Sequence, residues 1–139
     1  MGINSKNHFQ SSFRNELNNQ QKRAILGALI CTAEADSKIT IQEEKVIEQI
    51  IDLLGIDMSD PFFNRPANIQ EINSALNSLD RNKQEWLLFA LHTLIICDGG
   101  FNDDETSFII GFAKDMGISE YELVEIIQNY VQRSINKDY

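Results

Sequence analysis

The stretch that decides the fold runs from residue 86 to residue 118 and reads WLLFALHTLIICDGGFNDDETSFIIGFAKDMGI. It consists of a run of apolar residues, the sequence Asp-Gly-Gly that interrupts it, a short acidic segment and a second apolar run that ends in Gly-Ile. In the second run, apolar residues recur at the spacing that places them on one side of a helix. The pattern therefore predicts two helices joined by an acidic turn.

The same pattern occurs a second time, 62 residues earlier. The shared motif D-x-x-[IF]-x-x-x-E starts at Asp36 in the first copy and at Asp98 in the second, and an apolar helix ending in Gly-Ile follows each time. We expect repeat one to span about 24–58 and repeat two about 86–120. The two helix-turn-helix repeats would then be related by an approximate internal two-fold axis.

No stretch alternates apolar and polar residues between hairpin turns, so the sequence predicts an all-α fold of about seven helices. We expect a flexible lead-in with a short N-terminal helix over residues 1–18 and a single helical domain over residues 19–139. Further helices are predicted over about 19–35, 40–55, 68–79, 81–97, 102–117 and 119–136, with an irregular connection over 57–66, which holds both prolines.

Two features of these helices predict how they pack. The helix over 81–97 is apolar nearly all round from Trp86 to Ile96, which is typical of a central helix surrounded by others. Ile69, Phe108 and Val131 fall on the predicted apolar faces of three other helices, so we expect these side chains to point inward.

Charge is unevenly distributed along the chain, whose formal net charge is −9. Eight acidic and two basic residues lie between Glu34 and Asp60, and eight acidic residues and one basic residue lie between Asp98 and Ile127. Acidity therefore follows the two repeats. Nucleic acid is not expected as a partner, because its binding requires a basic surface. Cations or a basic protein are the natural complements.

The cysteines and the apolar segments indicate the compartment. Cys31 and Cys97 lie among apolar residues, and we interpret them as free thiols of a reducing environment. The first twelve residues lack the apolar core of a secretory signal. The longest apolar stretch, residues 86–97, is too short to span a bilayer. We expect a soluble, cytoplasmic protein without direct membrane insertion.

The acidic turns are the candidate functional site. Each repeat places an aspartate after one helix and a glutamate in the first turn of the next, which gives the pairs Asp36–Glu43 and Asp98–Glu105; Asp103 and Asp104 adjoin the second pair. Convergent oxygens of this kind suit a divalent cation. Helix capping alone is the alternative, and the residues by themselves favour it, since Glu43 completes a capping box with Thr40 and Glu105 stands at the corresponding place after Asn102. The spacing excludes an EF-hand, because isoleucine occupies the twelfth position of both turns.

These two motif copies resemble the tellurite-resistance TerB-like family. The resemblance implies an all-helical cytoplasmic domain, acidic residues that chelate a metal, a link to resistance against tellurite and other stresses, and protein partners beside the membrane. The matching positions are Asp36, Glu43, Asp98 and Glu105. The first copy reads Asp36-Ser37-Lys38 where the family has Asp-Gly. Because Lys38 would oppose a nearby cation, we favour the second pair.

Three functional hypotheses follow. The leading one is a non-enzymatic, TerB-like protein of a stress or tellurite response that binds a divalent metal ion of unknown identity at its acidic turns. The alternative is a metal-independent protein–protein interaction module that uses an acidic surface. The third, a hydrolase that uses the carboxylates, lacks any recognisable catalytic motif. His92 is a further candidate on the central helix, although a lone histidine there is more often a core residue.

Overall fold

The structure is a computed structural model that describes residues 16–35, 38–65, 67–97 and 103–137, with side chains described up to residue 132. Its helices are α3 (Asn19–Ala33), α4 (Ile41–Leu54), α5 (Pro61–Asn64), α6 (Ile69–Asn77), α7 (Arg81–Ile96), α8 (Asp103–Asp115) and α9 (Glu120–Lys137). No strand occurs within these residues, so the predicted all-α class is confirmed. The short N-terminal helix expected within residues 1–18 falls almost entirely outside the described residues.

Local sequence signals set most of the helix ends. The N-cap residues Asn18, Thr40 and Asn68 each close a capping box at the start of α3, α4 and α6. Gly55 and Gly117 follow α4 and α8 with φ angles of 69° and 78°. Because side chains other than glycine rarely adopt a positive φ, these glycines end their helices where the sequence predicts.

The connection between the two halves contains a helix that we did not expect. Residues Pro61–Asn64 form α5, because Asp60 accepts a hydrogen bond from the Phe62 backbone N–H at 2.9 Å and proline suits the first helical position. Phe63 is buried, whereas Phe62 is half-buried. The prediction of an irregular segment over 57–66 was therefore wrong for these four residues.

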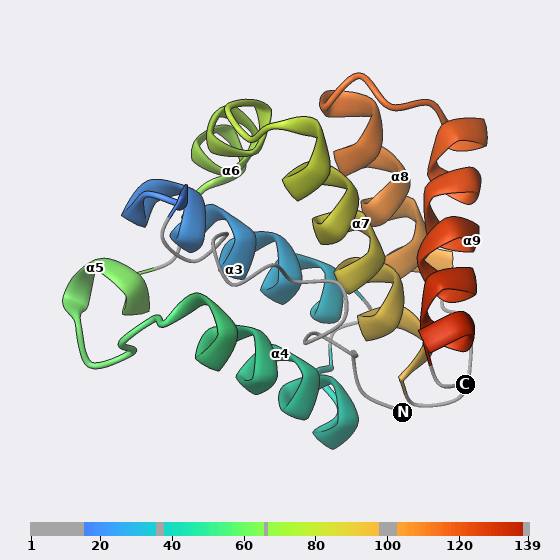
Figure 1. Cartoon of the computed structure of the whole chain (residues 1–139). Helices are drawn as coiled ribbons and strands as arrows, with labels where there is room; N and C mark the ends of the chain where they lie inside the picture. Colours follow the sequence, from blue (N-terminus) through green and yellow to red (C-terminus); the bar gives the residue numbers. More distant parts are fainter. Residues whose placement is uncertain (1–15, 36–37, 66, 98–102, 138–139) are drawn as a thin grey trace.

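Helix α7 is the centre of the molecule. It contacts α3, α4, α8 and α9, and Figure 1 shows it running between α3 on one side and α8 and α9 on the other. The side chains of Leu87, Leu88, Leu91 and Leu94 are fully buried. On the side of α7 that faces α9, the Phe89 ring stacks on Tyr130 of α9 with 5.0 Å between ring centroids. The expectation of a central fifth helix is thus confirmed.

The two repeats make corresponding contacts. Helix α3 packs on α4 and α8, and α7 packs on α8 and α4. Residues at equivalent positions are buried alike, as Ile50 is with Phe112 and Ile56 with Ile118. These observations agree with the expected internal two-fold axis, which itself remains a prediction.

Three side chains that we expected to point inward are exposed. Ile69 at the start of α6 is 50% exposed, Phe108 of α8 is 38% exposed and Val131 of α9 is 41% exposed. Ile69 and Phe108 line a common apolar groove, because the side chains of α6 and α8 do not fill the space between these two helices. Val131 lies one turn beyond Ile127, which is itself only half-buried.

Within the described residues, no helix combines the length and the apolar character that crossing a bilayer requires. Cys31 and Cys97 are half-buried and form no disulfide bond within the part of the chain that the structure describes. Burial, and secondarily the charge of Glu34, raises the pKa of the Cys31 thiol.

Candidate acidic site

The first turn of α4 positions Glu43. The Thr40 hydroxyl accepts a hydrogen bond from the Glu43 backbone N–H at 3.1 Å, and Oε1 of Glu43 accepts one from the Thr40 backbone N–H at 2.8 Å. This is the reciprocal capping box that the sequence predicts. Because both residues are fixed by backbone contacts, the carboxylate is held at the start of the helix, where the helix dipole favours a negative charge.

Capping does not use the whole Glu43 carboxylate. The residue is only 1% exposed, and its second oxygen, Oε2, is buried without a hydrogen-bond partner among the described residues. Burying an ionised oxygen without compensation is costly, so such an atom requires a cation, a water molecule or another donor. Glu43 therefore retains one oxygen that is available for a further contact.

The first turn of α8 carries the second acidic group. Glu105 is 3% exposed, whereas Asp103 and Asp104 are exposed at the helix start. The residue expected to cap this helix, Asn102, lies outside the described residues. The structure thus places a buried glutamate at equivalent positions of both repeats, but the capping box expected for the second copy remains a prediction.

The aspartates of both pairs, Asp36 and Asp98, lie outside the described residues. The predicted approach of Asp36 to Glu43 and of Asp98 to Glu105 is therefore not tested. Among the residues that are described, no three side chains of His, Cys, Asp or Glu converge as a metal site requires. The described residues fit a cation only in part, since each turn supplies one buried carboxylate and the other oxygens would come from the rest of the turn, from backbone carbonyls and from water.

His92 lies on α7 and is half-buried. It lines a cavity with Thr106 and Ile109 of α8 and with Glu120 of α9. Burial lowers the pKa of His92 below its ordinary value and so favours the neutral imidazole. A neutral imidazole is compatible with either a core histidine or a ligand, and its role remains a prediction.

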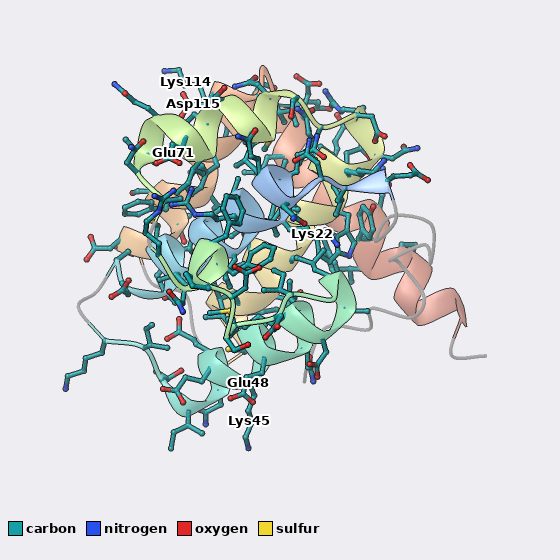
Figure 2. All side chains as sticks on the ribbon, turned by 90° about the vertical axis from the view of Figure 1, so that its left-hand side faces the viewer. Lys22, Lys45, Glu48, Glu71, Lys114 and Asp115 are labelled. Carbon is teal, nitrogen blue, oxygen red and sulfur yellow. The ribbon has the colours of Figure 1, made fainter. Side chains whose placement is uncertain are left out.

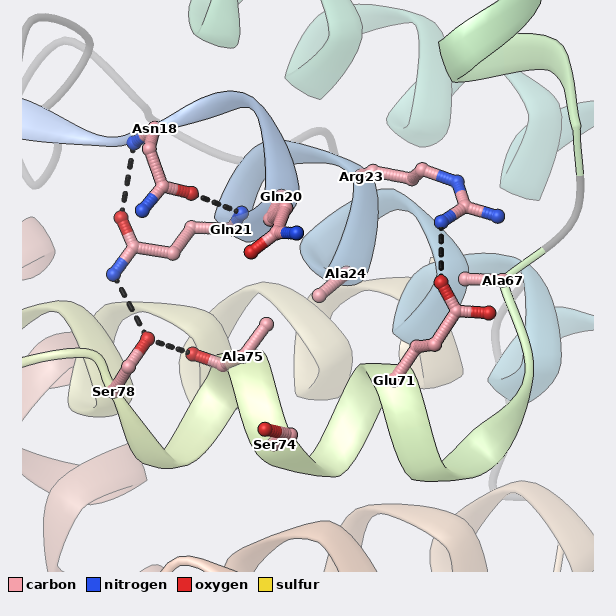
Figure 3. Close-up of a pocket in the computed structure, with 10 residues that line it drawn as sticks. All are labelled: Asn18, Gln20, Gln21, Arg23, Ala24, Ala67, Glu71, Ser74, Ala75 and Ser78. Carbon is pink, nitrogen blue, oxygen red and sulfur yellow. Dashed lines mark hydrogen bonds and ion pairs between the residues drawn. The ribbon is translucent and has the colours of Figure 1, made fainter.

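A polar cavity between α3 and α6 was missed by the sequence analysis. It measures about 340 Å³ and contains the ion pair between Arg23 Nη1 and Glu71 Oε2 at 2.6 Å. Figure 3 shows this pair facing across the cavity, and Gln21 reaching from the Asn18 backbone to the Ser78 hydroxyl. The hydrogen bond from Arg23 also lowers the pKa of Glu71. Because these polar groups bond to one another, they stabilise the contact of α3 with α6.

Sequence spacing gave no signal for the Arg23–Glu71 pair, since 48 residues separate the two side chains. The available signal was a charged residue at a position where the helical periodicity of α3 calls for an apolar one. Arg23 follows two polar residues and precedes Ala24 and Ile25, and it is only 6% exposed. A buried arginine requires an acceptor, but the periodicity does not identify which one.

The fold and the site define a class: a helical protein that buries a glutamate in the first turn of two of its helices. Residues 4–65 match the family model described as tellurite resistance protein TerB. This match confirms, over those residues, the resemblance expected from the sequence. It covers less than half of the chain and includes Thr40 and Glu43 of the first turn. Comparisons with curated proteins and with solved structures gave no match.

Proposed function

We propose that this is a non-enzymatic, cytoplasmic protein of a tellurite or stress response that binds a divalent cation at one or both acidic turns. The match of residues 4–65 to the TerB family supports the assignment to that response. The buried Glu43 Oε2, which has no hydrogen-bond partner among the described residues, is the observation that supports the cation. Oxygen ligands select hard cations, so we expect Mg²⁺, Ca²⁺ or Mn²⁺ rather than a thiophilic metal.

Thermal unfolding with and without added cation tests this proposal. A ligand that binds only the folded state stabilises it by about 2.7 kcal/mol at one hundred times its dissociation constant. We expect the parent protein to gain stability with one of these cations and to lose the gain in chelator. Unchanged melting of the parent in every cation would remove the metal from the proposal.

Two variants separate ligation from capping. Glu43→Gln keeps the capping box, because glutamine serves at this position as glutamate does, but it removes the charge that a cation requires. We expect Glu43→Gln to fold normally and to lose part or all of the cation-dependent gain. Glu48→Gln is the matched control, since Glu48 is exposed on the same helix and should retain the gain. Glu105→Gln tests the second turn in the same way.

A metal-independent interaction module is the second candidate function. Glu44, Glu48 and Asp52 are all exposed and follow one another at intervals of four residues along α4, so they form an acidic row. Figure 2 shows Glu48, with the neighbouring Lys45, pointing away from the body of the molecule. A basic protein partner, including one associated with a membrane, suits this row.

Co-purification distinguishes the two candidates. An acidic docking surface predicts a partner that dissociates as the salt concentration rises and is indifferent to chelator. Charge reversal of the row, as in Glu44→Lys with Glu48→Lys, should abolish capture. A partner lost in chelator at constant ionic strength would instead favour the cation.

A further inference from the structure

We propose that the apolar groove between α7, α8 and α9 binds a basic amphipathic helix of a partner protein. This surface is separate from the acidic row of α4, and the inference requires neither a bound metal nor the proposed response. Figure 1 shows α8 and α9 side by side with α7 beside them. The groove lies where these three helices meet and has a volume of about 250 Å³.

The groove is the cavity that His92 lines, and most of its lining side chains are aliphatic, with His92, Thr106 and Gln128 among the polar ones. Ile95, Ile109 and Leu123 are buried at its base, while Ile110 and Ile127 are half-buried and Val124 is 49% exposed. Val124, Ile127 and Val131 are spaced three and four residues apart, so they form one apolar stripe along α9. Val131 continues this stripe beyond the groove with 41% exposure. A stripe of this spacing suits a helical partner, whose own apolar residues recur at the same intervals.

Charge around the groove indicates what kind of helix fits. Glu120 lines it at the start of α9, and no lysine or arginine does so among the described residues. Asp103 lies three residues before Thr106 and seven before Ile110, so it shares the face of α8 that carries these two lining residues. Asp103 is the first residue of α8 and Glu120 the first residue of α9, and because the two helices run in opposite directions, these acidic residues lie toward opposite ends of the helix pair. A helix with basic residues flanking its apolar face complements both ends.

The same charges argue against the other occupants. A second copy of this chain would bring Asp103 and Glu120 against like charges, in a protein whose formal net charge is −9. An anionic membrane surface would be repelled for the same reason. Basic amphipathic helices are the remaining class that pairs with both the apolar stripe and the acidic ends.

The probe for the test is a synthetic helical peptide of roughly 18 residues, long enough to form a helix on binding, with leucines on one face and lysines on the other. A leucine–glutamate peptide with the same leucine positions is the control. Binding is measured by fluorescence anisotropy in chelator at about 0.15 M salt, so that neither a metal nor weak surface attraction contributes. We expect the lysine peptide to bind and the glutamate peptide not to bind.

Matched variants locate the binding surface. Val124→Gln should weaken binding of the lysine peptide about fivefold or more. Ile69→Gln is its control, because Ile69 is 50% exposed on α6 and does not line this groove. Glu120→Gln should weaken binding about two- to threefold and reduce its salt dependence, whereas Glu125→Gln should not, because Glu125 is exposed on the same helix but does not line the groove. All four side chains are at least partly exposed, so circular dichroism should show a retained fold.

Several outcomes would overturn the proposal. One is that Val124→Gln and Ile69→Gln weaken binding of the lysine peptide equally. The others are that both peptides bind equally well or that neither peptide binds. A dimer of the parent protein that Val124→Gln dissociates would assign the groove to a second copy. Groove-dependent binding to vesicles with anionic lipids would assign it to a membrane. These outcomes do not test the proposed cation, because all peptide measurements are made in chelator.

Discussion

At the scale of single residues, two glycines of the second repeat occupy opposite environments. Gly117 ends α8 with φ at 78°, a conformation that other residues rarely adopt. Gly111 lies within α8, and a Cβ atom built on it would meet nothing within 4 Å. We expect Gly117→Ala to destabilise the protein by about 1 kcal/mol and Gly111→Ala to stabilise it by about 0.5–1 kcal/mol.

Chemical denaturation of the two glycine variants measures these changes directly. Both substitutions add one methyl group, at a position within α8 for Gly111 and just after α8 for Gly117. The added methyl group by itself therefore cannot explain why one variant gains stability and the other loses it. Equal effects of Gly117→Ala and Gly111→Ala would show that the left-handed end of α8 is not formed as described.

His92 gives a pH-dependent prediction. Burial lowers the pKa of His92 in the folded protein. As pH falls below about 6.5, the unfolded chain therefore binds a proton before the folded chain does. The free energy of unfolding should decrease with falling pH through this window, and the decrease should be smaller in His92→Gln.

Denaturation at about pH 7.5 and about pH 5.5 measures the effect, with His8→Gln as the control for the other histidine. The same pH dependence in the parent and in both variants would contradict a buried, neutral imidazole. Carboxylates contribute equally to all three proteins, so the comparison isolates the histidine.

Caps were predictable from the sequence at this scale, because they join residues three apart. The box of Thr40 with Glu43 forms as expected, and the same spacing at Ser119 and Glu122 gives a second box with hydrogen bonds of 3.1 and 3.2 Å. The pairing of Arg23 with Glu71 was not predictable, since it depends on the packing of α3 against α6.

At the scale of elements, the contact of α3 with α6 depends on Gly27. A Cβ atom at this position would lie 3.0 Å from Cδ1 of Ile72, which is closer than side chains normally approach. Gly27→Val should push the helices apart and cost about 1–3 kcal/mol of stability. The combination with Ile72→Ala should cost less than the sum of the two single changes, because removing the isoleucine makes room for the new side chain.

A double-mutant cycle by chemical denaturation measures this coupling. Additive costs of Gly27→Val and Ile72→Ala would show that the two side chains do not meet.

Helix positions were largely predictable because most of the longer helices carry a periodic apolar face, a cap or both. Helix α5 was missed because four residues are too few to show a period. The exposure of Ile69 and Phe108 was missed for another reason. Periodicity tells which side of a helix is apolar, but it does not tell how completely a neighbouring helix covers that side.

At the scale of the whole molecule, acidity and burial occur together at the starts of α4 and α8. Glu43 and Glu105 are buried, while the acids around them remain exposed. The sequence identified both glutamates because they stand at the same place in two copies of one motif. Whether Asp36 and Asp98 complete the turns was not predictable from spacing, because the path of a turn is set by its backbone and not by the number of residues.

Native mass spectrometry of the purified protein, with and without chelator, tests the proposed cation most directly. We predict a retained divalent ion in the parent protein that is lost in chelator and lost or reduced in the double variant Glu43→Gln, Glu105→Gln, which keeps its fold. Glu48→Gln should retain the ion. A parent protein that carries no ion when purified and none when supplied with Mg²⁺, Ca²⁺ or Mn²⁺ would contradict a cation at these turns.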